Sequence, residues 1–481
     1  MGGVNLLERC GDVRQSSMSK LKPIRYAIGA VVCFHLAYAD PRLGFFIFGF
    51  LYCLLQMAPM ESMERLFGLG LATGLVIYSP HLFFFWNIFS VLAVVLWLIL
   101  SSFLAVFLVL ARASWRRWGR VGLAVAAPFL WTGLEYFRGE LFKLKFTWLS
   151  AGFAFSGSPQ MHWIAGLGLY GIGFVLMSAA SVVYLLPVKL RVGGIAVVVG
   201  LLLIPWPRGS ETKPAGLLRV AGVQLEGASM GRILSSLDAL IQRYPSADLL
   251  VLSEYTFDSP VPPAVRDWCL DHHRYLLVGG KDPLANGDYY DTAFVVGPDG
   301  QVIFKQAKSV PVQLFKDGLP ALDQKVWNSP WGKIGVGICY DASYRRVVDE
   351  LVNQGAQALV FPTMDVIAWG GQEHRMNAMV APFRAAEYGV PLFRLASSGI
   401  SEAVNADGSL QASANFPGDG EMMYAEFQLP VHGRLPLDYW FAPVCVAVAG
   451  ALVLWEVICD IRPRFYRKKA VWIGPTNPLS P

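Results

Sequence analysis

Three polar side chains stand where apolar, strand-like runs end, and their chemical types suit nucleophilic catalysis. Cys339 ends a Gly-rich run, Glu254 directly follows a second run, and Lys308 ends a third segment that rises from a Pro-Asp-Gly turn. A thiol becomes a strong nucleophile when a base takes its proton; a carboxylate can be that base, and an ammonium offsets developing negative charge. Each residue alone also fits a structural role: a core cysteine, a salt-bridged glutamate, or a lysine that protects an edge strand.

The elements that would position these residues lie between about 215 and 435, where β-rich runs alternate with helical or turn-rich segments. The helical or turn-rich segments include 235–244 and 374–388, and a polar, helix-compatible segment follows Cys339. The predicted strands are 218–223, 249–252, 275–278, 292–296, 302–304, 334–338, 358–361 and 392–395. This alternation indicates a layered α/β domain with sheets inside and helices outside.

The rest of the 481-residue chain is too apolar for an ordinary soluble protein. Hydrophobic residues make up 54% of it and the mean hydropathy is +0.44, so part of the chain is expected to lie in a membrane. Eight apolar runs, several near the roughly 20 residues that a crossing needs, are predicted to span it. They cover 24–39, 43–60, 66–79, 84–111, 121–137, 162–187, 192–206 and 439–459.

Basic residues predict the orientation of these spans. With a cytoplasmic amino terminus, the loops after the second, fourth and sixth spans should carry Lys and Arg. Those loops contain Arg65, the cluster at 112–120, and Lys189 with Arg191, and further basic residues at 462–469 follow the last span. The α/β block is therefore expected outside the cytoplasm. No small-residue cleavage site follows the amino-terminal basic residues, so we expect the first span to be retained.

Composition argues against two other classes of site. The net charge of +5 is modest, and the Lys and Arg clusters stand at the ends of apolar runs, which fits membrane topology better than nucleic-acid binding. The 7 cysteines form no CxxC pair and no array with histidine, so neither a disulfide framework nor a metal site is predicted.

Taken in chain order, Glu254, Lys308 and Cys339 resemble the Glu-Lys-Cys triad of the carbon–nitrogen hydrolase (nitrilase) superfamily. The resemblance implies that Glu254 is the general base, that Lys308 orients it and offsets oxyanion charge, and that Cys339 forms a thioester. The backbone N–H of Tyr340 would be a second oxyanion donor, and Asp341 is the acid that follows the Cys-Tyr pair in the superfamily.

Lys305 competes with Lys308 for the middle role. An offset of three places their side chains on opposite faces of a strand, so only one can point inward. The superfamily's lysine usually stands eight residues after the turn glycine, here Gly300, which favours Lys308.

Seven predicted helices before such a domain and one after it resemble a narrower family, the apolipoprotein N-acyltransferases of bacterial inner membranes. Two segments support the resemblance: PFLWTGLEYFRG at 128–139 and APFRAAEYGVPLFRLASSGI at 381–400. The chain departs from the family at SVPVQLFKDG, where a second active-site carboxylate is missing and Gln313 or Asp317 would have to replace it. Trp369 lies where the family has a mobile aromatic loop near the substrate, or else anchors the chain at the membrane interface. Gln313 and Glu387 are weaker candidates for substrate contacts.

The resemblance implies a nitrilase-like α-β-β-α sandwich inserted between transmembrane helices of a bacterial inner-membrane protein. A phospholipid would give its acyl chain to Cys339, and the α-amino group of a diacylglyceryl cysteine at a lipoprotein's amino terminus would accept it, with no cofactor and no metal. The protein is expected to be a monomer. Two rivals remain: a membrane-anchored amidase or nitrilase-type hydrolase, and a scaffold without activity.

The expected organisation divides the chain into five parts. They are a cytoplasmic amino terminus (1–23), a seven-helix transmembrane domain (24–207), a periplasmic catalytic domain (215–435), a last transmembrane helix (439–459) and a cytoplasmic tail (460–481).

Overall fold

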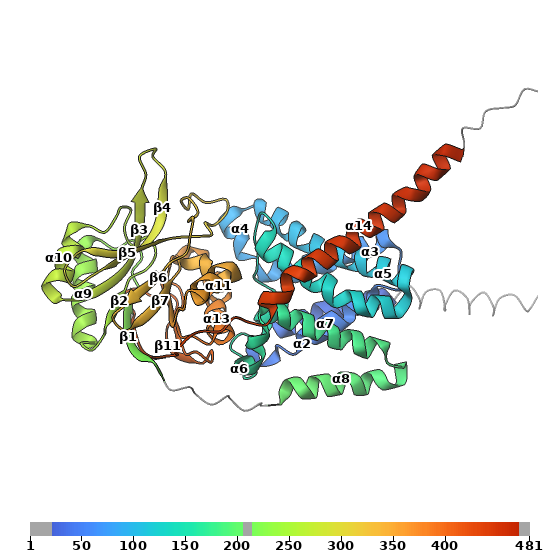
Figure 1. The fold of residues 1–481 in the computed structure, drawn as a ribbon, viewed down its shortest axis with the longest axis horizontal. Helices are drawn as coiled ribbons and strands as arrows, with labels where there is room; N and C mark the ends of the chain where they lie inside the picture. Colours follow the sequence, from blue (N-terminus) through green and yellow to red (C-terminus); the bar gives the residue numbers. More distant parts are fainter. Residues whose placement is uncertain (1–21, 205–213, 471–481) are drawn as a thin grey trace, which may run out of the picture.

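The computed structural model describes residues 22–204 and 214–470, with the side chains of 460–470 excepted. Figure 1 shows an elongated molecule in which a bundle of helices packs end to end against an α/β sandwich. The predicted fold class, an α-helical bundle joined to an α-β-β-α sandwich, is confirmed. The bundle contains a helix over 22–37, α2 (Phe46–Met57), α3 (Met63–His81), α4 (Phe84–Phe89), α5 (Leu92–Tyr136), α6 (Met161–Ile164), α7 (Leu169–Leu185), α8 (Val188–Leu203) and α14 (Asp438–Ala470).

The bundle helices follow the predicted apolar runs, with two differences in how the runs divide. The run at 162–187 is divided between α6 and α7, with a bend of 93° before α7. The run at 84–111 is shared between α4 and α5, and the run at 121–137 forms the second half of α5. A kink at Gly119 separates the two halves of α5, because its φ of +66° is a left-handed conformation that glycine adopts readily.

Several bundle helices have the character of membrane spans. By length and composition, the described chain offers two single spans, Leu92–Leu141 and Asp438–Cys459, and a bent pair, Met161–Leu167 with Leu169–Leu185, that would make a third. The count of eight crossings stays a prediction. The basic residues at 9–20 and 462–469 that predict the orientation have side chains outside the described residues.

Two six-stranded sheets form the centre of the sandwich. One has the order β12-β1-β2-β3-β4-β5 and the other β11-β10-β9-β8-β7-β6. In the first sheet β1, β2 and β3 run parallel, and in the second sheet β7, β8 and β9 run parallel. The strands on either side of these three pair antiparallel. The strands are β1 (Gly216–Val223), β2 (Leu249–Val251), β3 (Tyr275–Pro283), β4 (Tyr289–Val296), β5 (Val302–Ala307), β6 (Val326–Ser329), β7 (Gly332–Val336), β8 (Ala358–Thr363), β9 (Leu392–Ala396), β10 (Ser401–Val404), β11 (Leu410–Ala414) and β12 (Met422–Leu429).

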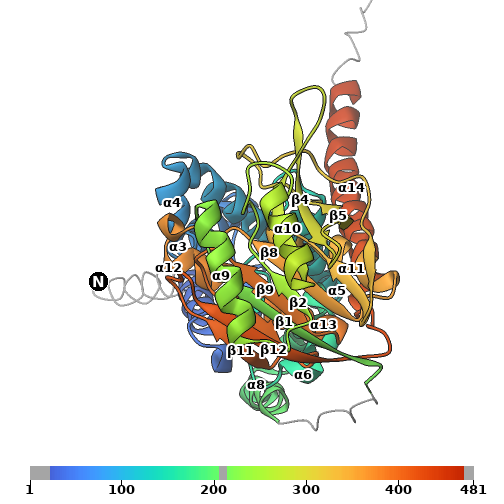
Figure 2. The same ribbon diagram turned by 90° about the vertical axis from the view of Figure 1, so that its left-hand side faces the viewer.

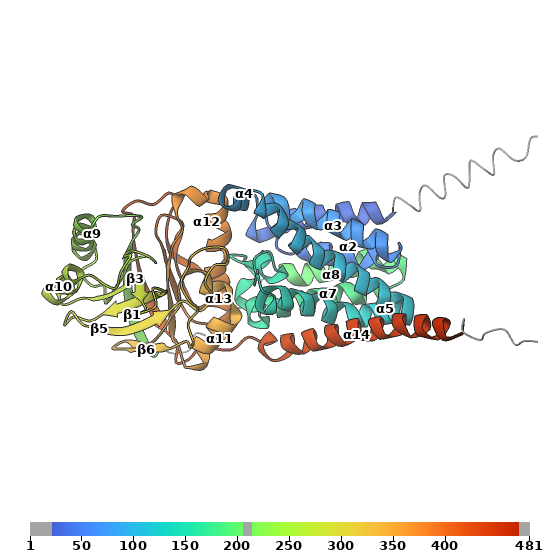
Figure 3. The same cartoon turned by 90° about the horizontal axis from the view of Figure 1, so that it is seen from above.

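Helices cover both outer faces of the sheets. Figure 2 shows α9 (Met230–Arg243) and α10 (Pro263–His272) lying over the first sheet, and Figure 3 shows α11 (Arg345–Asn353), α12 (Gly371–Ala378) and α13 (Val380–Tyr388) between the second sheet and the bundle. Buried apolar side chains fill the space between the sheets and the space under α9 and α10. A third cluster is continuous from the bundle to α11 and α13, so the bundle and the sandwich share one core.

Candidate active site

The three predicted catalytic residues come together between the sheets. Glu254 follows β2, Lys308 directly follows β5, and Cys339 follows β7, so two sheets contribute to one place. All three are buried, with 2%, 1% and 8% of their surface exposed. Burying a charged group costs free energy unless the group is paired, so these side chains are expected to have partners of opposite charge.

The ammonium of Lys308 is the centre of the charge network. Its Nζ lies 2.6 Å from Glu254 Oε1 and 2.7 Å from Asp317 Oδ2, and 3.6 Å from Asp291 Oδ2. Burial alone would lower the pKa of Lys308, but these carboxylates raise it well above its usual value, so the group stays charged. Lys305 points the other way: its side chain is 50% exposed and pairs with Asp282.

The thiol of Cys339 sits on a sharp turn. Cys339 has a φ of +47°, an uncommon left-handed conformation for a residue other than glycine, and a single turn of 3-10 helix (Cys339–Ser343) begins there. The Sγ atom lies 3.9 Å from the carbonyl oxygen of Met364, whose N–H donates to Glu254 Oε2 at 2.5 Å. One backbone residue therefore contacts both the thiol and the carboxylate.

The surroundings keep this thiol protonated at rest. Burial raises the pKa of Cys339 well above its usual value, the negative charge of Glu254 raises it further, and Lys308 lowers it. A thiol in this state needs a base at the moment of reaction. Glu254 is fixed by an ammonium on one oxygen and a backbone N–H on the other, and its role as that base stays a prediction.

Asp341 connects the turn at Cys339 to the segment after Lys308. Its carboxylate accepts hydrogen bonds from the N–H groups of Ser309, Val310 and Ile338, at 2.8–3.2 Å. Burial raises the pKa of Asp341 to about 6. We infer that Asp341 sets the position of the loop and turn. The oxyanion role of the neighbouring Tyr340 N–H stays a prediction.

Asp317 is one of the two candidates for replacing the carboxylate that the sequence lacks. It contacts Lys308, accepts a hydrogen bond from Tyr255 at 3.0 Å, and accepts another from the Val312 N–H at 2.6 Å. Gln313, the other candidate, is half-buried and donates weakly to the Pro311 carbonyl at 3.4 Å. Of the two alternatives, only Asp317 joins the ionic network.

Sequence reasoning missed Asp291, a third carboxylate of this network. It lies on β4, is fully buried, and its carboxylate is among the buried polar groups that have no hydrogen-bond partner in the described structure. One oxygen from each of Glu254, Asp291 and Asp317 lies within 4.8 Å of the others. Such a cluster resembles a cation site, and here the Lys308 ammonium fills that role. The signal available in the sequence was an aspartate at the start of an apolar strand.

A second buried network holds the loop that carries Met364. Asp365 accepts hydrogen bonds from Arg394 at 2.6 Å and Asn377 at 2.9 Å. His374 Nδ1 lies 3.5 Å from Asp365 Oδ2 and 3.4 Å from Glu373 Oε2, and these three residues could supply metal ligands. The Arg394 guanidinium already balances the charge of Asp365, so we assign this network to positioning the loop at the thiol.

The bundle reaches the site through aromatic side chains. The Trp148 indole lies edge-on to Tyr340, with ring centroids 5.8 Å apart, and donates to Ser343 Oγ at 3.0 Å. Trp369 is half-buried and lies 6.1 Å from Phe315, which lies 5.1 Å from Phe89 of α4. Trp369 therefore belongs to an aromatic row between the sandwich and the bundle.

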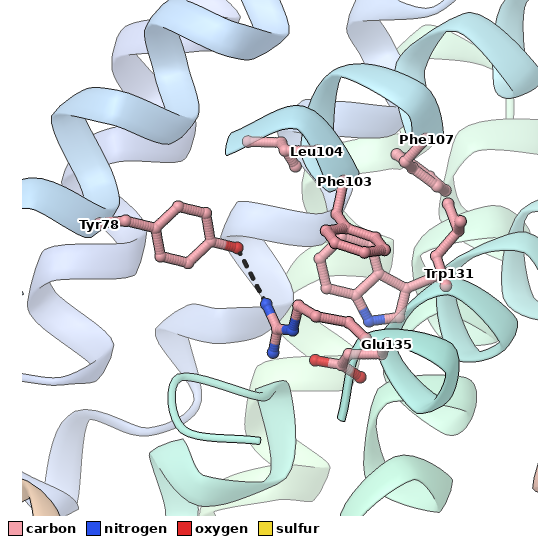
Figure 4. A pocket seen from close by; sticks show the side chains of 8 residues that line it. Tyr78, Phe103, Leu104, Phe107, Trp131 and Glu135 are labelled. Atoms are coloured by element: carbon pink, nitrogen blue, oxygen red, sulfur yellow. Dashed lines mark hydrogen bonds between the residues drawn. The ribbon is translucent and has the colours of Figure 1, made fainter. Parts of the chain in front are cut away.

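The bundle also contains a cavity. Tyr78, Phe103, Leu104, Phe107, Trp131, Leu134, Glu135 and Arg138 line it. The Arg138 guanidinium donates to the Tyr78 hydroxyl at 3.2 Å. Figure 4 shows Tyr78, Glu135 and Trp131 among the residues that line the cavity. Arg138 also donates to Ser150, and Glu135 accepts from the Ala151 N–H. These bonds fix the segment that carries Trp148.

Glu387 lies in a buried ion pair rather than on an open surface. Its carboxylate pairs with Arg384 and accepts a hydrogen bond from the Leu169 N–H at 2.8 Å. Asp438 likewise accepts from the N–H groups of Tyr170 and Gly171 at the start of α7 and pairs with Arg345 of α11 at 3.1 Å. Carboxylates at a helix amino terminus stabilise it. This geometry ties the sandwich to the bundle and favours a structural role for Glu387.

Comparison with known proteins agrees with both halves of the chain. Residues 30–182 match the family described as apolipoprotein N-acyltransferase N-terminal domain, and residues 264–436 match carbon-nitrogen hydrolase. The second match includes Lys308 and Cys339 and begins after Glu254.

Curated relatives extend over most of the chain. It is 26% identical over 467 residues to an apolipoprotein N-acyltransferase of Pseudomonas syringae, covering 83% of this chain and 90% of the relative. It is 23% identical over 421 residues to that of Geobacter metallireducens, covering 74% and 80%. A solved carbon-nitrogen hydrolase from Helicobacter pylori aligns with a TM-score of 0.40 at 18% identity, over 53% of this chain and 98% of that one. The chain belongs to the apolipoprotein N-acyltransferase family of the nitrilase superfamily.

Proposed function

We propose that this protein is a membrane N-acyltransferase that moves a fatty acyl chain from a phospholipid to the α-amino group of a diacylglyceryl cysteine. The observation that carries the proposal is the buried Glu254–Lys308 ion pair beside the Cys339 turn, in a chain of this family. We further propose that the sandwich lies on the periplasmic side of a bacterial inner membrane.

In the first half-reaction, Glu254 accepts the thiol proton and the sulfur attacks the ester carbonyl of the phospholipid. The ammonium of Lys308 offsets the charge that develops on the carbonyl oxygen. The carbon–oxygen bond then breaks, and the lysophospholipid leaves as an alcohol with the proton that Glu254 held. An acyl thioester remains on Cys339.

In the second half-reaction, the amine of the acceptor attacks the thioester. Glu254 takes a proton from the attacking amine, the carbon–sulfur bond breaks, and the sulfur recovers its proton while an amide forms. The same base and the same ammonium serve both halves. Burial of the thiol favours the amine over water, because a closed site excludes the competing nucleophile.

A mass measurement of the full-length protein tests the proposal. Incubation with phospholipid should add one acyl chain to Cys339, and a diacylglyceryl peptide should then remove it as an amide. Cys339→Ala should abolish the adduct, whereas Cys269→Ala, at a buried free cysteine on α10, should keep it. Faster discharge by water than by peptide would identify a hydrolase. The absence of any adduct on the wild-type protein would favour the scaffold.

A further inference from the structure

The Lys308 ammonium carries too little charge to balance the acids around it. Glu254, Asp317 and Asp291 converge on it, and three carboxylates against one ammonium would leave two net negative charges in a space closed to water. Like charges this close, in so dry a place, cannot all ionise at neutral pH. One of the three acids must carry a proton.

The contacts identify which acid that is. Glu254 has the ammonium at 2.6 Å and the Met364 N–H at 2.5 Å, and Asp317 has the ammonium at 2.7 Å and two further donors. Asp291 lies 3.6 Å from the ammonium, and neither of its oxygens accepts a hydrogen bond from the described chain. The acid that gains least from ionisation keeps the proton.

We propose that Asp291 is protonated at neutral pH and forms with Glu254 a carboxyl pair that shares this single proton. The neutral carboxyl positions Glu254 by hydrogen bonding and leaves the ammonium free for Glu254 and for the oxyanion. Ionised, Asp291 would compete for Lys308 and withdraw its charge from the reacting carbonyl.

The other groups around Asp291 do not change this assignment. Lys281 is its register partner on β3, but its ammonium pairs with the exposed Asp258 at 2.8 Å. Tyr255 donates to Asp317. Burial, and next the charge of Glu254, raise the pKa of Asp291 well above its usual value, in agreement with the geometry.

Difference infrared spectroscopy of the full-length protein tests where the proton lies, without any substrate. Wild type minus Asp291→Asn should contain the carbonyl band of a protonated carboxylic acid at pH 7, and the band should vanish at alkaline pH. Asp282→Asn, at a partly exposed acid on the adjacent strand, is the control and should remove no such band. An Asp291→Asn difference without the band at pH 7 would overturn the proposal.

The positioning role rests on the proposed function and has its own readout. In the wild type, the acylation rate of Cys339 should fall as pH rises above the pKa of the pair, because Asp291 ionises. The ratio of the Asp291→Asn rate to the wild-type rate should therefore rise by about tenfold per pH unit in that range. A ratio that stays constant from pH 6 to pH 10, on the order of four units, would refute this role. If the wild-type protein forms no adduct, the proposed function fails, while the infrared result still decides the position of the proton.

Discussion

Replacing Lys308 by methionine is the sharpest test of the charge network. The substitution keeps a long side chain and removes the only positive charge within hydrogen-bond reach of Glu254 and Asp317 in the described structure. Removing one partner of a buried ion pair costs about 3–5 kcal/mol, because the other charge stays buried without compensation. Lys305→Met is the matched control: that side chain is 50% exposed, so its pair with Asp282 contributes at most about 1 kcal/mol.

The loss should depend on pH in a defined direction. Without the ammonium, the carboxylates near position 308 have raised pKa values in the folded protein. An acid whose pKa is higher when folded stabilises the fold below its unfolded pKa, and this contribution is lost as pH rises through the folded pKa. Lys308→Met should therefore destabilise the protein more at pH 8 than at pH 5, since protonation relieves the uncompensated charge at the lower pH.

Thermal unfolding in detergent, followed by tryptophan fluorescence, measures both effects. One kcal/mol corresponds to roughly 2–4 °C for a large domain, so Lys308→Met should lower the midpoint by roughly 6–20 °C at pH 8. Adding Asp317→Asn should restore part of this loss without restoring activity. Equal midpoints for the Lys308 and Lys305 variants at pH 8 would show that the network is neither desolvated nor ionic, and the reasoning about the site would fail.

Two further predictions concern carboxylates outside the thiol site. Glu387→Gln should lower the unfolding midpoint, since a buried pair with Arg384 is broken at a cost of about 3–5 kcal/mol; a rise in KM with an unchanged midpoint would instead indicate a substrate contact. Burial raises the pKa of Glu402 to about 7, so its neutral form stabilises the fold at acidic pH and this contribution is lost as pH rises from about 4.5 to 7. Glu402→Gln should therefore stabilise the protein at pH 8, by about 3 kcal/mol at most, with no gain at pH 4, and equal midpoints at pH 8 would contradict this.

The strands that lead to Glu254 and Cys339 were predictable because they end in buried apolar residues, whereas β5, which leads to Lys308, is half-exposed and follows a Pro-Asp-Gly turn. A buried strand reads as an unbroken apolar run, and all eight runs in the sequence prediction are strands. The edge of the second sheet was not predictable in the same way. β10 contains the half-buried Glu402, and β11 is mostly exposed, so neither presents an apolar run. β6 and β12 were also missed.

The ionic environment of the thiol needed the folded chain. Asp291 and Asp317 are 26 residues apart in sequence, and only the antiparallel pairing of β4 and β5 with the return of the following loop brings both to Lys308. The nucleophile and its base can be found from the sequence because each stands at the end of an apolar run. The number of charged groups around the buried ammonium cannot be found in this way, because those groups are neighbours only in the folded chain.

The shared ionic contacts between bundle and sandwich limit how the chain can be recombined. Arg345 and Glu387 belong to the sandwich, and their partners Asp438 and the first N–H groups of α7 belong to the bundle. A chimera that joins a related sandwich to this bundle would leave these groups buried without their partners, unless Arg345, Glu387 and Asp438 are transferred together. The natural exchange unit is thus the sandwich with the first turn of α14, not the sandwich alone.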